Sequence, residues 1–201
     1  MAGAPIEFYF DFSSPYGYLG AQRVETVAAE FGRSVLWRPV LLGVIFKITG
    51  QTPLVSQTMR GPYAARDMAR SARKLGVKFA LPEAFPFSSV YPCRIFYWLD
   101  GGGPEDAKAY ARAAYDAAFI ANKPPAEPEA AVDLAVGLGH DRAAILAGMQ
   151  DPAIKERLRQ EVQLAMDKGV FGSPFFIVDG EPFWGNDRLG EVREWLQTGG
   201  W

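Results

Sequence analysis

The chain has 201 residues, of which 49% are hydrophobic and 13% aromatic, and its formal net charge is −2. That is enough apolar material for one sizeable core. No basic block stands out, so we expect no nucleic-acid partner. No apolar run approaches the roughly 18 residues that cross a bilayer, so we expect no membrane partner either.

Cysteine and histidine are each used once, which excludes several enzyme classes. Cys93 alone cannot form an internal disulfide, which fits a reducing compartment and predicts a cytoplasmic location. His140 alone provides no histidine cluster for a metal site and no partner set for a Ser-His-Asp triad. We therefore assign no metal-binding residues.

The N-terminal segment has the pattern of a βαβ unit. Residues 6–12 alternate and are rich in β-formers, and Ser14-Pro15 is typical of a helix start. Apolar residues then recur at helical spacing as far as Phe31, and Gly32 marks the end of that helix. Residues 34–40 form the second predicted strand.

The middle of the chain has helical periodicity and the C-terminal segment returns to strands. The predicted helices are 60–75, 89–100, 105–122, 129–138, 142–147 and 152–168, separated by glycine and proline. Residues 175–178 and 181–184 flank an Asp-Gly turn and predict a hairpin, after which Asp187 can cap a last helix. If both ends share one sheet, the helical block is an insertion.

Three motifs carry a family resemblance: FDFSSPYGYL at 10–19, GVFGSPFFI at 169–177 and FWGNDRL at 183–189. Together they resemble the 2-hydroxychromene-2-carboxylate isomerases and, more distantly, the kappa-class glutathione transferases. The resemblance implies an α/β, thioredoxin-like fold of the DsbA type with a large all-helical insertion. Residues 1–42 and 169–201 would then form the thioredoxin-like domain, and residues 43–168 the insertion.

The helix start at Ser14 is the predicted catalytic centre. Ser14, Pro15, Tyr16 and Gly17 stand where a dithiol oxidoreductase has Cys-x-x-Cys, so disulfide exchange is excluded because it requires thiolates. Ser14 alone fits a simple N-cap, but a helix N-terminus with a hydroxyl also favours a thiolate. The resemblance implies that glutathione provides this thiolate and that Ser14 holds it.

Two further segments are predicted to bind glutathione. The resemblance implies that Pro174 is cis and that the backbone of Ser173 pairs with the cysteinyl portion of glutathione. The alternative is an ordinary trans proline at the start of a strand. Trp184, Gly185, Asn186 and Asp187 are assigned to the γ-glutamyl end, the alternative being that Asp187 is only a cap and Trp184 only core.

The substrate contacts are assigned to a separate set of residues. Lys47, on an expected loop between apolar neighbours, could pair with a substrate carboxylate, the alternative being a solvated lysine. Ser88 falls where the resembled enzymes usually have asparagine, and this departure leaves the identity of the substrate open. A planar substrate would suit the aromatic residues expected near the site, which are Phe12, Tyr16, Phe46, Phe87 and Trp184.

The function that the resemblance implies is a glutathione-dependent isomerase of 2-hydroxychromene-2-carboxylate or a similar aromatic carboxylate. Reversible thiolate addition would accompany ring opening and bond rotation, with glutathione regenerated as a cofactor. One alternative is a kappa-like transferase or peroxidase that consumes glutathione. Another is a redox-inactive thioredoxin-like binding protein. The resembled enzymes are commonly dimers, so a homodimer is also an expectation.

Overall fold

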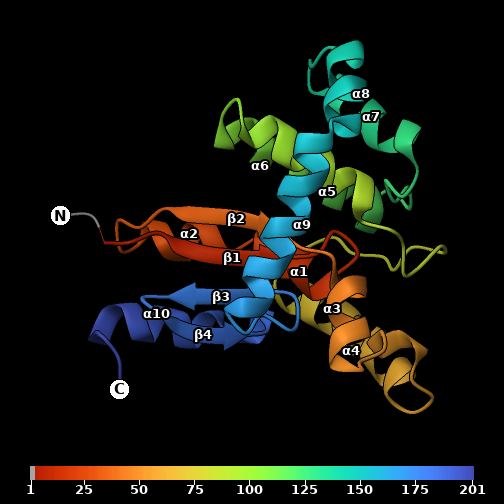
Figure 1. Cartoon of the computed structure of the whole chain (residues 1–201). Coiled ribbons are helices and arrows are strands. Elements are labelled where there is room, and N and C mark those ends of the chain that lie inside the picture. The colour runs from red at the N-terminus through yellow and green to blue at the C-terminus, as the bar shows by residue number, and fades with distance from the viewer. Residues whose placement is uncertain (1–2) are drawn as a thin grey trace.

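Strands from the two ends of the chain meet in one four-stranded sheet with the order β2-β1-β3-β4 (Figure 1). The structure is a computed structural model that describes residues 3–201. The strands are β1 (Ile6–Phe10), β2 (Val35–Pro39), β3 (Phe175–Val178) and β4 (Glu181–Trp184). β1 pairs with β2 in parallel and with β3 antiparallel, and β3 pairs antiparallel with β4. The predicted βαβ unit and C-terminal hairpin are therefore confirmed.

The helix between β1 and β2 is shorter than predicted. Two helices, α1 (Pro15–Ala21) and α2 (Val24–Ala29), replace the single helix expected as far as Phe31. The backbone N–H of Arg23 bonds to the carbonyl of Gly20 at 3.0 Å. This tighter turn, with its bond over three residues, closes α1 after two turns. β1 also ends at Phe10, two residues earlier than expected.

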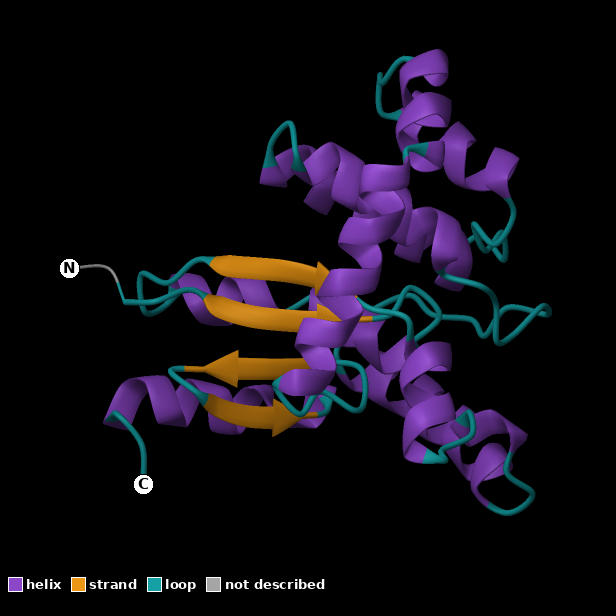
Figure 2. Ribbon diagram, in the orientation of Figure 1, coloured by secondary structure: helices purple, strands orange, loops and turns teal. Residues whose placement is uncertain are grey.

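The helical middle of the chain is confirmed, with boundaries within a few residues of those predicted. Its helices are α4 (Arg60–Lys74), α5 (Val90–Asp100), α6 (Pro104–Phe119), α7 (Pro128–Gly137), α8 (Arg142–Gln150) and α9 (Pro152–Asp167). Helices α5–α8 gather beyond the β2 edge of the sheet, while α9 crosses back over the sheet towards β3 (Figures 1 and 2). The division into 1–42, 43–168 and 169–201 as domains stays a prediction.

Two local predictions were wrong. Lys47 is not on a loop but in a helix, α3 (Leu42–Thr49), whose first N–H donates to the Asp11 carboxylate at 2.7 Å. A distant side chain thus stabilises a helix start that has no local cap. Asp187 does not cap the last helix, because it lies within a 3₁₀ turn, η2 (Asn186–Arg188), and α10 (Leu189–Thr198) begins after it.

Aromatic packing forms the centre of the core. The Phe10 ring lies 5.0 Å from Phe8, 5.4 Å from Trp37 and 5.8 Å from Tyr115, centroid to centroid. Each such side chain contributes about 1.5–3 kcal/mol when fully buried. This core fixes the carboxyl end of β1, where the candidate site begins. Across residues 3–201, no helix has the length and apolar character to span a bilayer.

Candidate active site

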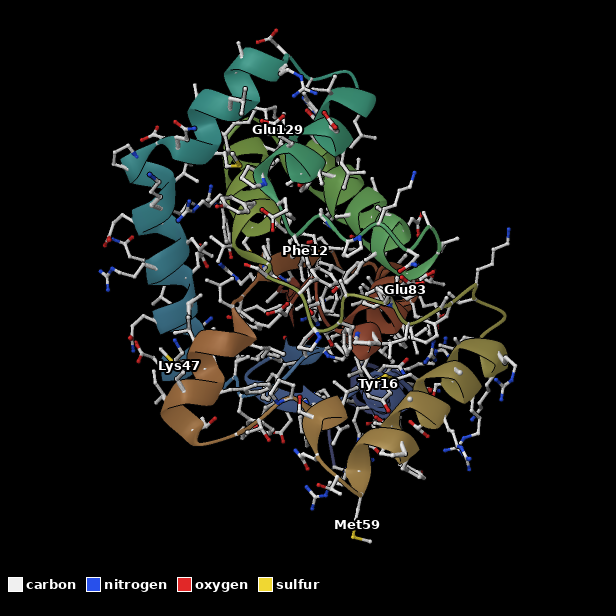
Figure 3. The ribbon with its side chains drawn as sticks, turned by 90° about the vertical axis from the view of Figure 1, so that its right-hand side faces the viewer. Phe12, Tyr16, Lys47, Met59, Glu83 and Glu129 are labelled. Atoms are coloured by element: carbon white, nitrogen blue, oxygen red, sulfur yellow. The ribbon has the colours of Figure 1, made fainter. Side chains whose placement is uncertain are left out.

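A cleft of about 720 Å³ opens past the carboxyl end of β1, within the usual size range of small-molecule sites. One wall comes from α1 and the segments around β3 and β4. The other wall comes from α3, α4 and the 3₁₀ turn η1 (Leu54–Ser56). In Figure 3, Tyr16 lies between α1 and α4. The predicted cofactor-binding residues of both ends of the chain meet at this cleft, except Pro174, which lies directly behind Ser173.

Ser14 lies at the base of the first wall as the N-cap of α1. Its Oγ accepts from the N–H of Gly17 at 3.0 Å and donates to the carbonyl of Ser173 at 3.0 Å. The predicted cap and the predicted proline at the first helical position are both confirmed. The side chain is 7% exposed, so its hydroxyl is accessible only from the cleft.

The Ser173-Pro174 peptide bond is cis, as the resemblance implied, and faces the start of α1. Ser173 Oγ accepts from the backbone N–H of Asp11 at 3.0 Å, which fixes the turn against β1. Among residues 3–201, the backbone N–H groups of Ser173 and Tyr16 have no acceptor. Two free donors therefore lie beside the Ser14 hydroxyl.

Gly17 allows this close approach. A Cβ at this position would lie 2.7 Å from both Ser173 Oγ and the hydroxyl of Tyr115. Any larger residue would force α1 and the Ser173 turn apart. The glycine is thus a requirement of the site rather than of the helix.

Asp11 is a buried carboxylate that joins the parts of the site. It accepts from the N–H of Ser13 at 2.7 Å, from the N–H of Leu42 at 2.7 Å and from the hydroxyl of Ser89, which is the N-cap residue of α5. Burial raises the pKa of Asp11, while the hydrogen bonds from Ser89, Leu42 and Ser13 act in the opposite direction. Asp11 therefore connects the segment before α1 to the starts of α3 and α5.

The third motif lines the far end of the cleft with Trp184, Gly185, Asn186 and Asp187. Trp184 packs at 4.8 Å on the ring of Phe171 but is 55% exposed, so it is a cleft wall and not core. Asn186 is 7% exposed, and its Oδ1 is a buried acceptor without a donor among the described residues. Such a group costs about 1–3 kcal/mol unless a ligand satisfies it.

The two predicted substrate residues do not join this cluster. Lys47 is exposed on α3 and does not line the cleft, and Figure 3 places it away from Tyr16. Ser88 is also exposed and outside the lining, although Phe85, Pro86 and Phe87 beside it are part of the wall. Their roles stay predictions.

Four of the five aromatic residues expected at the site line the cleft: Tyr16, Phe46, Phe87 and Trp184. Phe12 is instead fully buried in the core, packed against Tyr115.

Sequence reasoning missed the α4 side of the cleft. Asp67, Met68 and Ser71 line it, and Asp67 accepts from the hydroxyl of Tyr16 at 2.7 Å. Burial, and then the Asp67 carboxylate, raise the pKa of Tyr16, so the phenol stays protonated. The helical period of residues 60–74 predicted α4, but nothing local indicates which face of it meets α1.

The residues present fit a bound glutathione. A peptide with a thiol, free amide groups and an ammonium group could use the Ser14 hydroxyl, the Ser173 N–H and the Asn186 Oδ1 acceptor. Because α1 has only two turns, its dipole stabilises a bound anion less than the dipole of the long predicted helix would.

Comparisons with known proteins agree with this geometry. The family model described as a DSBA-like thioredoxin domain matches residues 5–197. A 2-hydroxychromene-2-carboxylate isomerase of Sphingobium xenophagum is 29% identical over 95% of this chain and 97% of its own length. A glutathione S-transferase kappa 2 of Caenorhabditis elegans is 24% identical over 95% of this chain and 91% of its own.

A solved structure shares the whole architecture. The structure of a 2-hydroxychromene-2-carboxylate isomerase superposes with a TM-score of 0.86 and 26% sequence identity. The match covers 96% of this chain and 94% of that one. The fold predicted from the motifs, thioredoxin-like with a large helical block between its strands, is therefore confirmed.

Proposed function

Because the chain belongs to the DSBA-like thioredoxin domain family, we propose that it is a glutathione-dependent isomerase of 2-hydroxychromene-2-carboxylate or a similar aromatic carboxylate. The observation that carries this proposal is the convergence of Ser14, Ser173 and Asn186 on one cleft whose other half is lined mainly by apolar residues. Relatives named as isomerases of this type, at 25–29% identity, support the reaction class.

Three groups of the chain would hold glutathione. Ser173 would offer its free backbone N–H to the peptide portion, and Ser14 its hydroxyl to the sulfur. Asn186, with its unsatisfied Oδ1, would accept from an N–H or ammonium group, and Asp187 beside it adds a negative charge suited to the ammonium. Bound glutathione would supply a thiolate nucleophile, which this chain lacks at the site.

Ser14 must redirect its proton to do this. In the ligand-free geometry the hydroxyl donates to the carbonyl of Ser173. A hydroxyl rotates freely about its C–O bond, and a thiolate is a stronger acceptor than a neutral carbonyl. The Gly17 N–H keeps the oxygen itself in place while the proton turns. Ser14 would thus lower the pKa of the bound thiol.

The apolar half of the cleft would take the aromatic part of the substrate. Its lining comes from Leu42, Phe46, Leu54, Met68, Pro86 and Phe87. Such a surface suits a flat hydrophobic ring, which it would orient beside the sulfur. Lys47 and Ser88 would contact the substrate only from outside this lining, and we retain them as proposed contacts on that basis.

A kappa-like transferase is the alternative, since a relative of that name matches over nearly the whole chain. It would use the same cleft but consume glutathione. A redox-inactive binding protein would need no thiol at all.

One assay separates these functions. Purified protein is mixed with 2-hydroxychromene-2-carboxylate, with and without glutathione, and the conversion is followed by absorbance while free thiol is titrated. Conversion that needs glutathione but leaves its concentration unchanged supports the isomerase. Loss of thiol matched to product indicates the transferase, and conversion at the rate of a protein-free blank contradicts both.

A further inference from the structure

Helix α4 forms part of the wall opposite Ser14 and is joined to α1 by one hydrogen bond. The Tyr16 hydroxyl, in the first turn of α1, donates to Asp67 Oδ2 on α4 at 2.7 Å. η1 and α4 lie in the segment 53–75. Among the described residues 3–201, no other hydrogen bond or ion pair joins this segment to a residue outside 52–77. We call this bond the Tyr16–Asp67 latch.

Residues on α4 prepare the latch for this role. Asp67 Oδ1 pairs with Arg70, one helical turn further along α4. The aspartate is therefore held in one orientation by its own helix, with its second oxygen turned towards α1. Burial, and then the Asp67 carboxylate, raise the pKa of Tyr16, so the phenol remains a hydrogen-bond donor at neutral pH.

Apolar packing complements the latch but is less directional. Ala64, Met68 and Ala72 bury one face of α4. Met68 has a flexible side chain, and none of these contacts has the directionality of a hydrogen bond. η1 packs against the start of α4, where the backbone of Gly61 leaves no room for a Cβ beside the carbonyl of Val55. The apolar half of the cleft is thus bounded by a unit with a single polar anchor.

We propose that Tyr16 and Asp67 are positioning residues that set the width of the cleft between the sulfur site and α4, and so the affinity for the electrophile. The inference rests on the proposed function for its ligand and deepens it. Tyr16 follows Ser14 by two residues and lines the same cleft. Loss of the latch should weaken binding of groups attached to the sulfur while leaving glutathione itself little affected.

The test uses variants that separate the hydrogen bond from the charge. Tyr16→Phe and Asp67→Leu remove the bond, whereas Asp67→Asn removes the charge and keeps an oxygen that can accept. Tyr63→Phe is the matched control, because it removes a hydroxyl from α4 that contacts Arg70 but not α1. Calorimetry gives the Kd values of glutathione and S-benzylglutathione, and hydrogen–deuterium exchange reports the opening of residues 60–74.

The bond joins a phenol to a carboxylate, so its loss should weaken the binding of S-benzylglutathione about tenfold. The affinity for glutathione should change less than about twofold. Amide exchange in α4 should accelerate by a similar factor, and Tyr63→Phe should match the wild type. The affinity for S-benzylglutathione should fall less in Asp67→Asn than in Asp67→Leu. The Tyr16→Phe/Asp67→Leu double variant should bind S-benzylglutathione no more weakly than either single variant.

Two results would overturn the inference. One is unchanged α4 exchange in Tyr16→Phe, and the other is faster exchange with an unchanged S-benzylglutathione affinity. If the wild type binds neither ligand, the proposed function fails instead, and the exchange comparison still decides whether the latch exists.

Discussion

Replacing Gly17 by alanine tests the contact between α1 and the Ser173 turn. The new Cβ would lie 2.7 Å from Ser173 Oγ and from the hydroxyl of Tyr115. Neither neighbour can move freely, because Ser173 Oγ accepts from the N–H of Asp11 at 3.0 Å and Tyr115 donates to the carbonyl of Asp11 at 3.1 Å. Overpacking of this kind costs about 1–3 kcal/mol, and glycine to alanine in a helix returns up to about 1 kcal/mol.

The expected net effect is a loss of up to about 2 kcal/mol in the free energy of unfolding, together with weaker glutathione binding. Urea denaturation followed by circular dichroism measures the first, and calorimetry the second. Gly190→Ala is the matched control, since it lies in α10 with open space around its Cβ and should be neutral or stabilising. If Gly17→Ala were as stable as Gly190→Ala, the close approach described here would be refuted.

Two further predictions concern buried groups. The folded-state pKa of Asp11 is raised, so the native protein binds this proton more tightly than the unfolded chain, and the stability from Asp11 is lost as pH rises through the folded pKa. Urea titrations at a series of pH values should therefore show that the unfolding free energy of Asp11→Asn, relative to that of the wild type, increases as the pH rises above about 4. A relative unfolding free energy that decreases or does not change with pH would contradict this. Burial raises the pKa of the Cys93 thiol, so a disulfide reagent should label it far more slowly in native than in urea-unfolded protein, by absorbance. Equal labelling rates would show that Cys93 is accessible.

Local chemistry made part of the fold and site predictable. Ser14 and Pro15 mark a helix start by their own capping preferences, and the Asp179-Gly180 turn marks the hairpin. The cis form of Pro174 could not be derived from neighbouring residues and came only from the resemblance. Periodicity located most helices, because an amphipathic face is a local property of the sequence.

Contacts between distant segments were not predictable in the same way. Asp11 meets Ser89 across 78 residues, and Tyr16 meets Asp67 across 51. The start of α3 depends on Asp11, which is why its first turn and Lys47 were mistaken for a loop. These pairs depend on tertiary packing, so no short stretch of the sequence indicates that the two residues meet.

Glutathione titration of the wild type and of Ser14→Ala tests the central claim most directly. Calorimetry is combined with the ultraviolet absorbance of the bound thiolate, and Ser34→Ala, an exposed serine outside the cleft lining, is the control. We expect saturable binding with thiolate absorbance near neutral pH, weakened by about tenfold or more in Ser14→Ala, as for a hydrogen bond to a charged group. Absence of binding up to millimolar glutathione, or equal affinity and absorbance in Ser14→Ala, would contradict the account.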